Sequence, residues 1–271
     1  MTARVAVVTG AARGIGAATV RGLVAAGWSV VAVDRAADDP RLPYRLGTRA
    51  ELDALAGDRV RTVAADATDP AAIAAAVGLA EAEFGGLDAA LAVAGVIAGG
   101  RPLWEMPPAE LDAVLDVDLR GAVTLARVGV PALLRRPEPR SGRFIAVASS
   151  AATRGLPLLA AYCAAKAGVT GLVRALAVEL GGTGVTANAV SPGSTDTPIL
   201  AESARLYGLG SAAEFARQQP IGRLLDPAEV AAALVWLAGE ASSGVTGAVL
   251  PVDGGLALGR FGGRAGRVDG A

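Results

Sequence analysis

The sequence predicts an α/β fold: a doubly wound parallel sheet of about seven strands with helices on both faces. Short β-rich segments alternate with longer alanine-rich segments along almost the whole chain. The β-rich segments are nearly unbroken apolar runs, which is typical of parallel strands covered on both faces. The alternation never lapses for long enough to mark a boundary, so we expect a single domain over residues 1–258.

The β-rich segments have the length and composition of buried strands. They are rich in Val and Ala, and several end at a Thr, Asp or Ser where the chain turns toward a helix. In chain order they are residues 4–9, 29–34, 59–65, 87–94, 142–149, 184–191 and 248–252.

The alanine-rich segments carry helix start and stop signals. Asp69 precedes Pro70 and Asp226 precedes Pro227, a capping residue followed by proline at the first helical position. Glycines follow the expected ends at Phe84 and Leu180. The predicted helices are residues 14–26, 70–84, 108–135, 158–180 and 227–240.

Two long segments are irregular. Residues 36–57 contain Pro40 and Pro43, and residues 196–226 have room for two short helical pieces at most. Both follow strands at the carboxyl edge of the sheet, so we expect them to cover a ligand site. The Gly- and Arg-rich tail, residues 259–271, has little to bury and is expected to be flexible.

Composition excludes several classes of protein. A net charge of −1 and a pI near 5.6 argue against nucleic acid or an anionic membrane as partner. No run of 18 apolar residues occurs, and a strand-like run begins almost at once, so we expect a cytoplasmic protein without membrane span or signal peptide. With Cys163 as the only cysteine and no histidine, we expect no internal disulfide and no metal site.

A glycine-rich turn joins the first strand to the first helix. It reads TGAARGIG, and its glycines Gly10, Gly14 and Gly16 let the turn close, let the backbone approach a pyrophosphate and let the helix pack on the strand. The backbone N–H groups around Gly14 and Ile15 open the helix and favour a bound pyrophosphate. The alternative interpretation is a tight turn without a ligand.

Charged residues next to this turn indicate which dinucleotide binds. Asp34 ends the second strand, where a carboxylate accepts hydrogen bonds from the ribose hydroxyls and repels a 2′-phosphate, which favours NAD. Arg13 and Arg35 are nearby cations that argue for NADP. Asp66 follows the third strand and is placed to meet the adenine edge, unless it caps the next helix, for which Asp69 is the better candidate.

The only lysine marks the candidate catalytic site. Of 25 Lys and Arg residues, one is Lys166, four positions after Tyr162, so that the two share a helix face. We expect the ammonium to lower the pKa of the phenol, which suits Tyr162 to general acid–base work. Ser149, at a strand end, is placed to donate to a substrate oxygen, with Ser150 as the alternative. The competing interpretation is a chance lysine on a solvated face.

Together these motifs resemble the short-chain dehydrogenase/reductase family over residues 4–256. The matching stretches are TGAARGIG, Asp34, Ser149, YCAAK, Asn188 to Gly193 (NAVSPG) and Val252 to Gly255 (VDGG). The resemblance implies an NAD-dependent oxidoreductase acting on CH–OH groups of an alcohol or ketone substrate. It implies that Tyr162 transfers the proton, that Lys166 lowers its pKa and holds the nicotinamide ribose, and that Ser149 orients the substrate oxygen.

The resemblance also implies a set of cofactor contacts and a homotetramer built on the long central helices and the last strand. The implied cofactor-binding residues are Gly10, Arg13, Gly14, Ile15, Gly16, Asp34, Arg35, Asp66, Ala94, Gly95, Tyr162, Lys166, Pro192, Gly193, Ser194, Thr195 and Thr197.

Two positions depart from the family pattern. The usual Asn-Asn-Ala-Gly run reads Ala92 to Gly95 (AVAG), which keeps only the Ala-Gly pair. The asparagine that supports a proton-relay water in the family is replaced here by Asp118, which is expected either to pair with Lys166 and retune the relay or to be a structural substitute in a helix bend.

Shorter stretches resemble the mycofactocin-coupled branch of this family. They are residues 38–44, 95–104, 154–157, 161–166 and 206–209. In that branch the NAD stays bound and the electrons leave to a peptide-derived carrier, mycofactocin. The alternatives are an ordinary NAD-exchanging dehydrogenase and a catalytically impaired NAD-binding protein. We expect the substrate pocket to be lined by Leu103, Trp104, Leu156, Leu158, Leu200 and Tyr207, unless these pack in the core.

Overall fold

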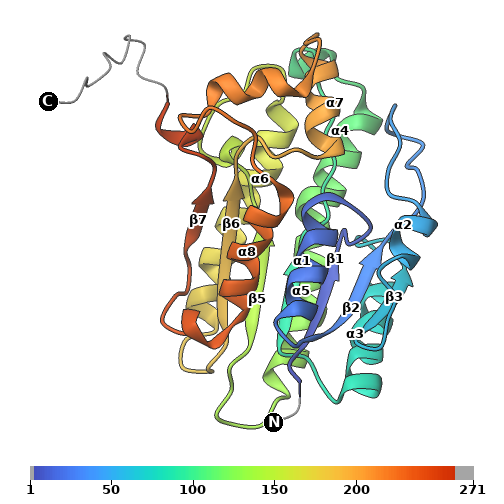
Figure 1. Cartoon of the computed structure of the whole chain (residues 1–271), viewed down its shortest axis with the longest axis vertical. Helices are drawn as coiled ribbons and strands as arrows, with labels where there is room; N and C mark the ends of the chain where they lie inside the picture. Colours follow the sequence, from blue (N-terminus) through green and yellow to red (C-terminus); the bar gives the residue numbers. More distant parts are fainter. Residues whose placement is uncertain (1–2, 260–271) are drawn as a thin grey trace, which may run out of the picture.

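The computed structural model describes residues 3–259, and one sheet forms its centre. All neighbouring strands are parallel, in the order β3-β2-β1-β4-β5-β6-β7 (Figure 1). The strands are β1 Val5–Thr9, β2 Ser29–Asp34, β3 Val60–Ala64, β4 Ala89–Ala92, β5 Arg143–Val147, β6 Thr186–Pro192 and β7 Val249–Val252. The predicted α/β fold class and all seven strands are confirmed, most with shorter ends.

Helices cover both faces of the sheet because the strands are apolar on both sides. On one face lie α3 (Pro70–Phe84), α5 (Gly121–Leu134) and α6 (Ala160–Glu179), whose buried residues share a core cluster with the sheet. On the other face lie α1 (Gly14–Ala25) and α8 (Pro227–Ala238), which pack closely on each other. The core is therefore divided into two layers by a sheet whose central strands are buried.

The predicted helix start signals act as expected. Asp69 caps α3, its Oδ1 accepting hydrogen bonds from the backbone N–H groups of Ala71 (2.8 Å) and Ala72 (3.3 Å). Asp226 and Glu229 form a reciprocal capping box at α8. The choice of Asp69 over Asp66 as the α3 cap is confirmed.

The predicted helix 108–135 is interrupted. It consists of α4 (Pro108–Leu115), a π-helical turn at Asp116–Arg120, and α5. A π turn inserts one extra residue into the helix, and such turns concentrate at functional sites. Here the turn carries Asp118, which is fully buried, so the prediction of a continuous helix was wrong at this position.

The irregular segments hold short helices. Residues 36–57 contain α2 (Arg49–Asp53), and residues 196–226 contain α7 (Pro198–Leu206) and a 3₁₀ turn at Ala212–Gln218, matching the two short pieces expected there. The second segment caps the end of the molecule where the strands terminate (Figure 1). Apart from Gly259, the tail expected to be flexible lies outside the described residues.

One described helix, α6, is long and apolar enough to cross a membrane by length and composition alone. In this fold it packs on β6 and contributes Val169 and Val173 to the core. Its hydrophobicity is therefore that of a core helix.

Candidate active site

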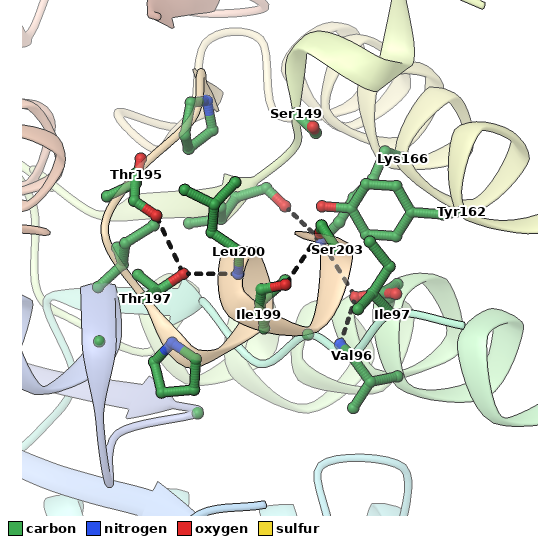
Figure 2. Close-up of a pocket in the computed structure, with 18 of the residues that line it drawn as sticks. Val96, Ile97, Ser149, Tyr162, Lys166, Thr195, Thr197, Ile199, Leu200 and Ser203 are labelled. Atoms are coloured by element: carbon green, nitrogen blue, oxygen red, sulfur yellow. Dashed lines mark hydrogen bonds and ion pairs between the residues drawn. The ribbon is translucent and has the colours of Figure 1, made fainter. Parts of the chain in front are cut away.

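A cavity of about 620 Å³ opens at the carboxyl ends of the strands. It lies where β1 has β2 on one side and β4 on the other, the point of reversal where doubly wound sheets bind ligands. Figure 2 shows Ser149, Tyr162 and Lys166 on one side of this cavity and Thr195 and Thr197 on the other. All the predicted catalytic and cofactor-binding residues contribute to its lining.

The glycine-rich turn forms one wall. Gly14, Ile15 and Gly16 line the cavity at the start of α1, and no side chain caps that end of the helix. Gly10 adopts a positive φ of 69°, and a Cβ there would lie 2.5 Å from the Ala94 Cα, so only glycine allows β1 and the segment after β4 to meet. The uncapped N–H groups suit a pyrophosphate.

Asp34 is held by the backbone around it. Its Oδ2 accepts from the N–H of Ala12 (3.0 Å) and its Oδ1 from the N–H of Ala36 (2.9 Å), which fixes the carboxylate at the cavity wall. Arg35 is turned away from any 2′-phosphate role, because its guanidinium pairs with Asp39 (2.7 Å) and Asp66 (3.5 Å). These contacts favour NAD over NADP.

The opposite end of the cavity is lined by the segment after β6. Thr195 Oγ1 donates to the Gly193 carbonyl (3.1 Å) and Thr197 Oγ1 to the Thr195 carbonyl (3.2 Å), which holds both hydroxyls at the wall (Figure 2). Gln219 exchanges two hydrogen bonds with the backbone of Ser194 (2.9 and 3.1 Å). These hydrogen bonds hold the segment after β6 in place along the cavity wall.

Lys166 and Asp118 form a buried ion pair. The Nζ of Lys166 lies 3.2 Å from Asp118 Oδ1, donates to the Val147 carbonyl (3.1 Å), and lies 5.6 Å from the centre of the Tyr162 ring. Asp118 Oδ1 also accepts from the N–H of Val96 (3.1 Å), whereas its buried Oδ2 has no hydrogen-bond partner among the described residues. The aspartate thus neutralises the ammonium that faces the phenol.

This pairing changes the acid–base properties of Tyr162. Burial raises the pKa of the phenol; Lys166 acts to lower it and Asp118 to raise it, and the net direction is upward. The expected lowering effect of Lys166 is present, but burial of the phenol, together with Asp118, outweighs it. Burial also raises the pKa of Asp118, against the lowering effect of Lys166. Burial acts to lower the pKa of Lys166, but Asp118 and Tyr162 together raise it.

Ser149 and Ser150 begin the 3₁₀ turn after β5. The Ser149 Oγ accepts from the N–H of Ala151 (3.1 Å) and lies at the cavity beside Tyr162 (Figure 2). Ser150 is buried, and its carbonyl accepts from the N–H of Arg154 (3.0 Å). The more accessible hydroxyl is therefore that of Ser149.

Three of the expected pocket residues lie outside the cavity. Leu156, Leu200 and Tyr207 line it, but Leu103, Trp104 and Leu158 do not and are exposed. The turn at Leu103–Glu105 places its apolar side chains in solvent, with Trp104 84 % exposed. That part of the prediction was wrong.

Sequence reasoning missed several residues that shape the site. The Thr9 Oγ1 accepts from the N–H groups of Val93 (3.2 Å) and Ala94 (3.4 Å), tying the ends of β1 and β4 together. Tyr44 accepts from the N–H of Ile97 (2.9 Å), and burial raises its pKa, so it stays a neutral phenol. Of these two residues, only Thr9 could have been found from the sequence, because it places a hydroxyl group at the end of a strand. No metal-binding group of three or more His, Cys, Asp or Glu is found within residues 3–259.

Comparison with known proteins identifies the family to which the chain belongs. Residues 10–257 match a family model described as enoyl-(acyl carrier protein) reductase, and a relative 44% identical spans nearly the whole chain. The chain belongs to the short-chain dehydrogenase/reductase family. That relative is the cis-4-hydroxycyclohexanecarboxylate dehydrogenase of Sinomonas cyclohexanicum, aligned over 93% of this chain and 96% of its own.

Further relatives of this dehydrogenase agree with the fold and the cofactor site. The D-threitol dehydrogenase of Mycolicibacterium smegmatis is 36% identical over 94% of this chain and 93% of its own. Among solved structures, the carveol dehydrogenase from Mycobacterium avium in complex with NAD superposes with a TM-score of 0.89 at 30% identity, covering 95% and 99% of the two chains. With Asp34 at the end of β2, this dehydrogenase is an NAD-dependent oxidoreductase acting on hydroxyl and carbonyl groups.

Proposed function

We propose that this dehydrogenase moves a hydride between an alcohol or ketone and an NAD that stays bound through turnover, and that the electrons leave to a mycofactocin-type carrier. The observation that carries the proposal is the segment of residues 36–47, which we call the strap. Leu46 and Gly47 line the cavity, and a Cβ on Gly47 would lie 3.2 Å from Asp34 Oδ1, so the strap lies against the expected adenosine site.

Ionic contacts fasten the strap on one side. Asp39 is 1% exposed and binds Arg35 (2.7 Å) and Arg41 (2.8 Å). Arg41 also reaches Asp116 of the π turn (2.8 Å). The hydrogen bonds from Arg41 hold the pKa of Asp39 to about 2, so the carboxylate stays charged at any pH where the enzyme works.

Apolar contacts and backbone hydrogen bonds fasten the other side. Leu42 is buried in a cluster with Val96 and residues of α4 and α6, and Tyr44 packs against the same cluster. Arg13, from the glycine-rich turn, donates to the Arg45 carbonyl (2.8 Å). Release of a nucleotide beneath the strap requires these contacts to break together, which supports a slowly exchanging cofactor.

The chemistry that we propose uses three side chains. Tyr162 takes the proton of the substrate hydroxyl, Ser149 donates a hydrogen bond to the same oxygen, and Lys166 stabilises the phenolate. The nicotinamide, when bound, accepts or returns the hydride. Asp118 sets the charge around Lys166, and its free Oδ2 is an acceptor for a relay water.

We assign the cofactor to the predicted contacts along the cavity. Gly10, Arg13, Gly14, Ile15 and Gly16 would face the pyrophosphate; Asp34, Arg35 and Asp66 the adenosine; and Ala94, Gly95, Pro192, Gly193, Thr195 and Thr197 the nicotinamide end, with Tyr162 and Lys166. The lining of the substrate end is largely apolar, which suits a hydrophobic or alicyclic alcohol. The Sinomonas relative named for 4-hydroxycyclohexanecarboxylate supports an alicyclic compound.

We further propose one domain over residues 1–258, a homotetramer and a cytoplasmic location. A tetramer is supported by apolar residues left exposed on the long helices, such as Val178 at 82%.

The test is to purify the protein without added cofactor, denature it, and quantify released nucleotide by mass spectrometry. Near-stoichiometric NAD supports the retained cofactor, and turnover of an alcohol with an artificial electron acceptor, but without added NAD, completes the case. Empty protein that turns over only with added NAD contradicts retention and leaves an ordinary exchanging dehydrogenase.

A further inference from the structure

A positive charge stands in the cavity away from the cofactor end. Arg154 lines the cavity on the segment between Ser149 and α6, and it is half-buried. The lining near Tyr162 and along residues 196–226, which we call the cap, is mainly apolar. It includes Leu156, Leu159, Leu200, Leu209, Phe215 and Leu256. Arg154 is the one charged side chain among these described lining residues of the substrate end.

No acidic residue within residues 3–259 neutralises this arginine. The other charged lining residues are Asp34, Arg35, Asp39, Asp66 and Arg13 at the adenosine end, and Asp118 paired with Lys166. The ion pairs of the described chain include no partner for Arg154. The charge is therefore unmatched by the protein around it.

The position of Arg154 is fixed from both sides. Its Nη1 donates to the Leu256 carbonyl (2.5 Å), and its backbone N–H donates to the Ser150 carbonyl (3.0 Å). Its own carbonyl accepts a weak hydrogen bond from the Sγ of Cys163 (3.8 Å), the residue after Tyr162. The remaining guanidinium donors have no hydrogen-bond partner among the described residues.

A guanidinium in an apolar wall favours a planar anion. Apolar surroundings weaken solvent screening, so an opposite charge brought into contact gains more than it would in water. The fork of N–H donors matches the two oxygens of a carboxylate. A neutral substrate would instead leave the cation partly desolvated without compensation.

We propose that the substrate is a hydroxy acid whose hydroxyl meets Tyr162 and Ser149 and whose carboxylate, across an apolar carbon framework, binds Arg154. This inference rests on the proposed function, because it assigns the reacting hydroxyl to Tyr162. The carboxylate takes no part in the redox step. The carbinol carbon gives its hydride to the bound NAD, and the hydroxyl proton passes to Tyr162. The product is a keto acid that keeps its carboxylate unchanged.

The activity test compares alicyclic and open-chain hydroxy acids with their own methyl esters, using an artificial electron acceptor and, in parallel, added NAD. We expect the wild-type enzyme to prefer an acid over its ester by roughly 10- to 100-fold in kcat/KM, the range of one charged hydrogen-bonded contact. Arg154→Gln should remove this preference mainly through KM, and Arg154→Lys should keep part of it. Arg217 is an exposed arginine of the cap that does not line the cavity, so Arg217→Gln should leave the preference for acids unchanged.

A purely structural role for Arg154, holding Leu256 in place, predicts equal losses for acids and esters. Equal losses, or no preference for acids in the wild-type enzyme, would overturn the inference. Turnover of alcohols in the same assay would leave the proposed function standing.

A binding measurement separates the two proposals. Cyclohexanecarboxylate, which has no hydroxyl to oxidise, should bind the NAD-loaded protein at least tenfold more tightly than its methyl ester, as followed by calorimetry, and Arg154→Gln should abolish the difference. Arginine-dependent binding without turnover of any hydroxy acid would uphold the carboxylate site but overturn the assignment of a hydroxy acid as the substrate; absence of turnover with every alcohol as well would contradict the proposed function. Equal binding of acid and ester would remove the site.

Discussion

At the scale of single residues, the chemistry is governed by the charge next to Lys166. A buried ammonium beside a neutral side chain lends its full field to a neighbouring phenol, whereas Asp118 cancels much of that field. Gly95 makes the arrangement possible, because a Cβ there would lie 2.7 Å from Asp118 Oδ1. The active site thus differs from the family pattern by one full charge.

Replacing Asp118 with Asn should move the acid limb of the pH–rate profile for alcohol oxidation to lower pH. Oxidation needs the Tyr162 phenolate; removing the carboxylate lowers the pKa of the phenol, so more phenolate exists below the limb. At a fixed pH below the limb, the rate should rise about tenfold for a phenol pKa lower by one pH unit. The measurement is kcat against pH; Asp112→Asn, an exposed aspartate of α4 that does not line the cavity, is the control. A limb that stays in place or moves to higher pH would refute this role for Asp118.

Tyr162→Phe should lower turnover by roughly 10² to 10⁴-fold, because the general base is lost while the ring remains. The NAD content after denaturation should equal that of the wild-type protein, since the phenyl ring still fills the wall. Oxidation of the preferred alcohol at the normal rate by this variant would show that the proton goes elsewhere.

At the scale of elements, the strap is tied to the rest of the fold at several buried points, although part of it is exposed. Its anchors come from Arg35 directly after β2, from the segment after β4 and from the π turn, so they join three parts of the fold to the strap. The folded-state pKa of Asp39 is depressed to about 2, so its contribution is present above the ordinary aspartate range and is lost only as pH falls toward 2. Retention of the cofactor should therefore not vary between pH 5 and pH 9.

Loosening the strap should speed cofactor release. Tyr44→Phe removes the hydrogen bond to Ile97, worth about 1 kcal/mol, and should raise the NAD off-rate roughly fivefold. The off-rate can be followed by exchange of the bound nucleotide against labelled NAD. Arg49→Gln, which removes an exposed pair with Asp53 on α2, serves as the control. Equal off-rates in the wild-type protein and the Tyr44 variant would mean that the strap does not limit release.

The strands, most helices and the glycine-rich turn could be predicted because their signals are local: apolar runs, caps and glycine spacing. The π turn could not be predicted, because the helical pattern of apolar and polar residues continues through residues 108–135 and gives no sign of the turn. The strap was found as an irregular segment, but its anchors join residues as distant as Arg41 and Asp116, which no local pattern links. Arg154 belongs to one of the stretches that resemble the mycofactocin-coupled branch, but no local pattern marks it as a cavity residue, since only the fold brings it there.

At the scale of the whole molecule, the exposed apolar residues of the long helices need an explanation. Val178 on α6 is 82% exposed, and Trp236 on α8 is 43% exposed. A second and further copies of the chain would cover such surfaces in a symmetric assembly.

The protein should therefore have a solution mass of four times 26.8 kDa. Light scattering coupled to size exclusion at micromolar concentration measures this directly. A mass of 26.8 kDa under those conditions would contradict the tetramer and leave the exposed helices for another partner.

The anchoring of Leu42 among residues of α4 and α6 has a consequence for how the cofactor enters and leaves. A segment with a buried leucine and a buried aspartate cannot swing aside; it must come out of the protein interior. The proposed retention of NAD therefore predicts that nucleotide exchange is a local unfolding event. Its rate should rise with urea and temperature as amide hydrogen exchange in the same segment does, and should be indifferent to how much free NAD competes. A chain that finishes folding around its nucleotide would then exchange it only as often as this segment unfolds.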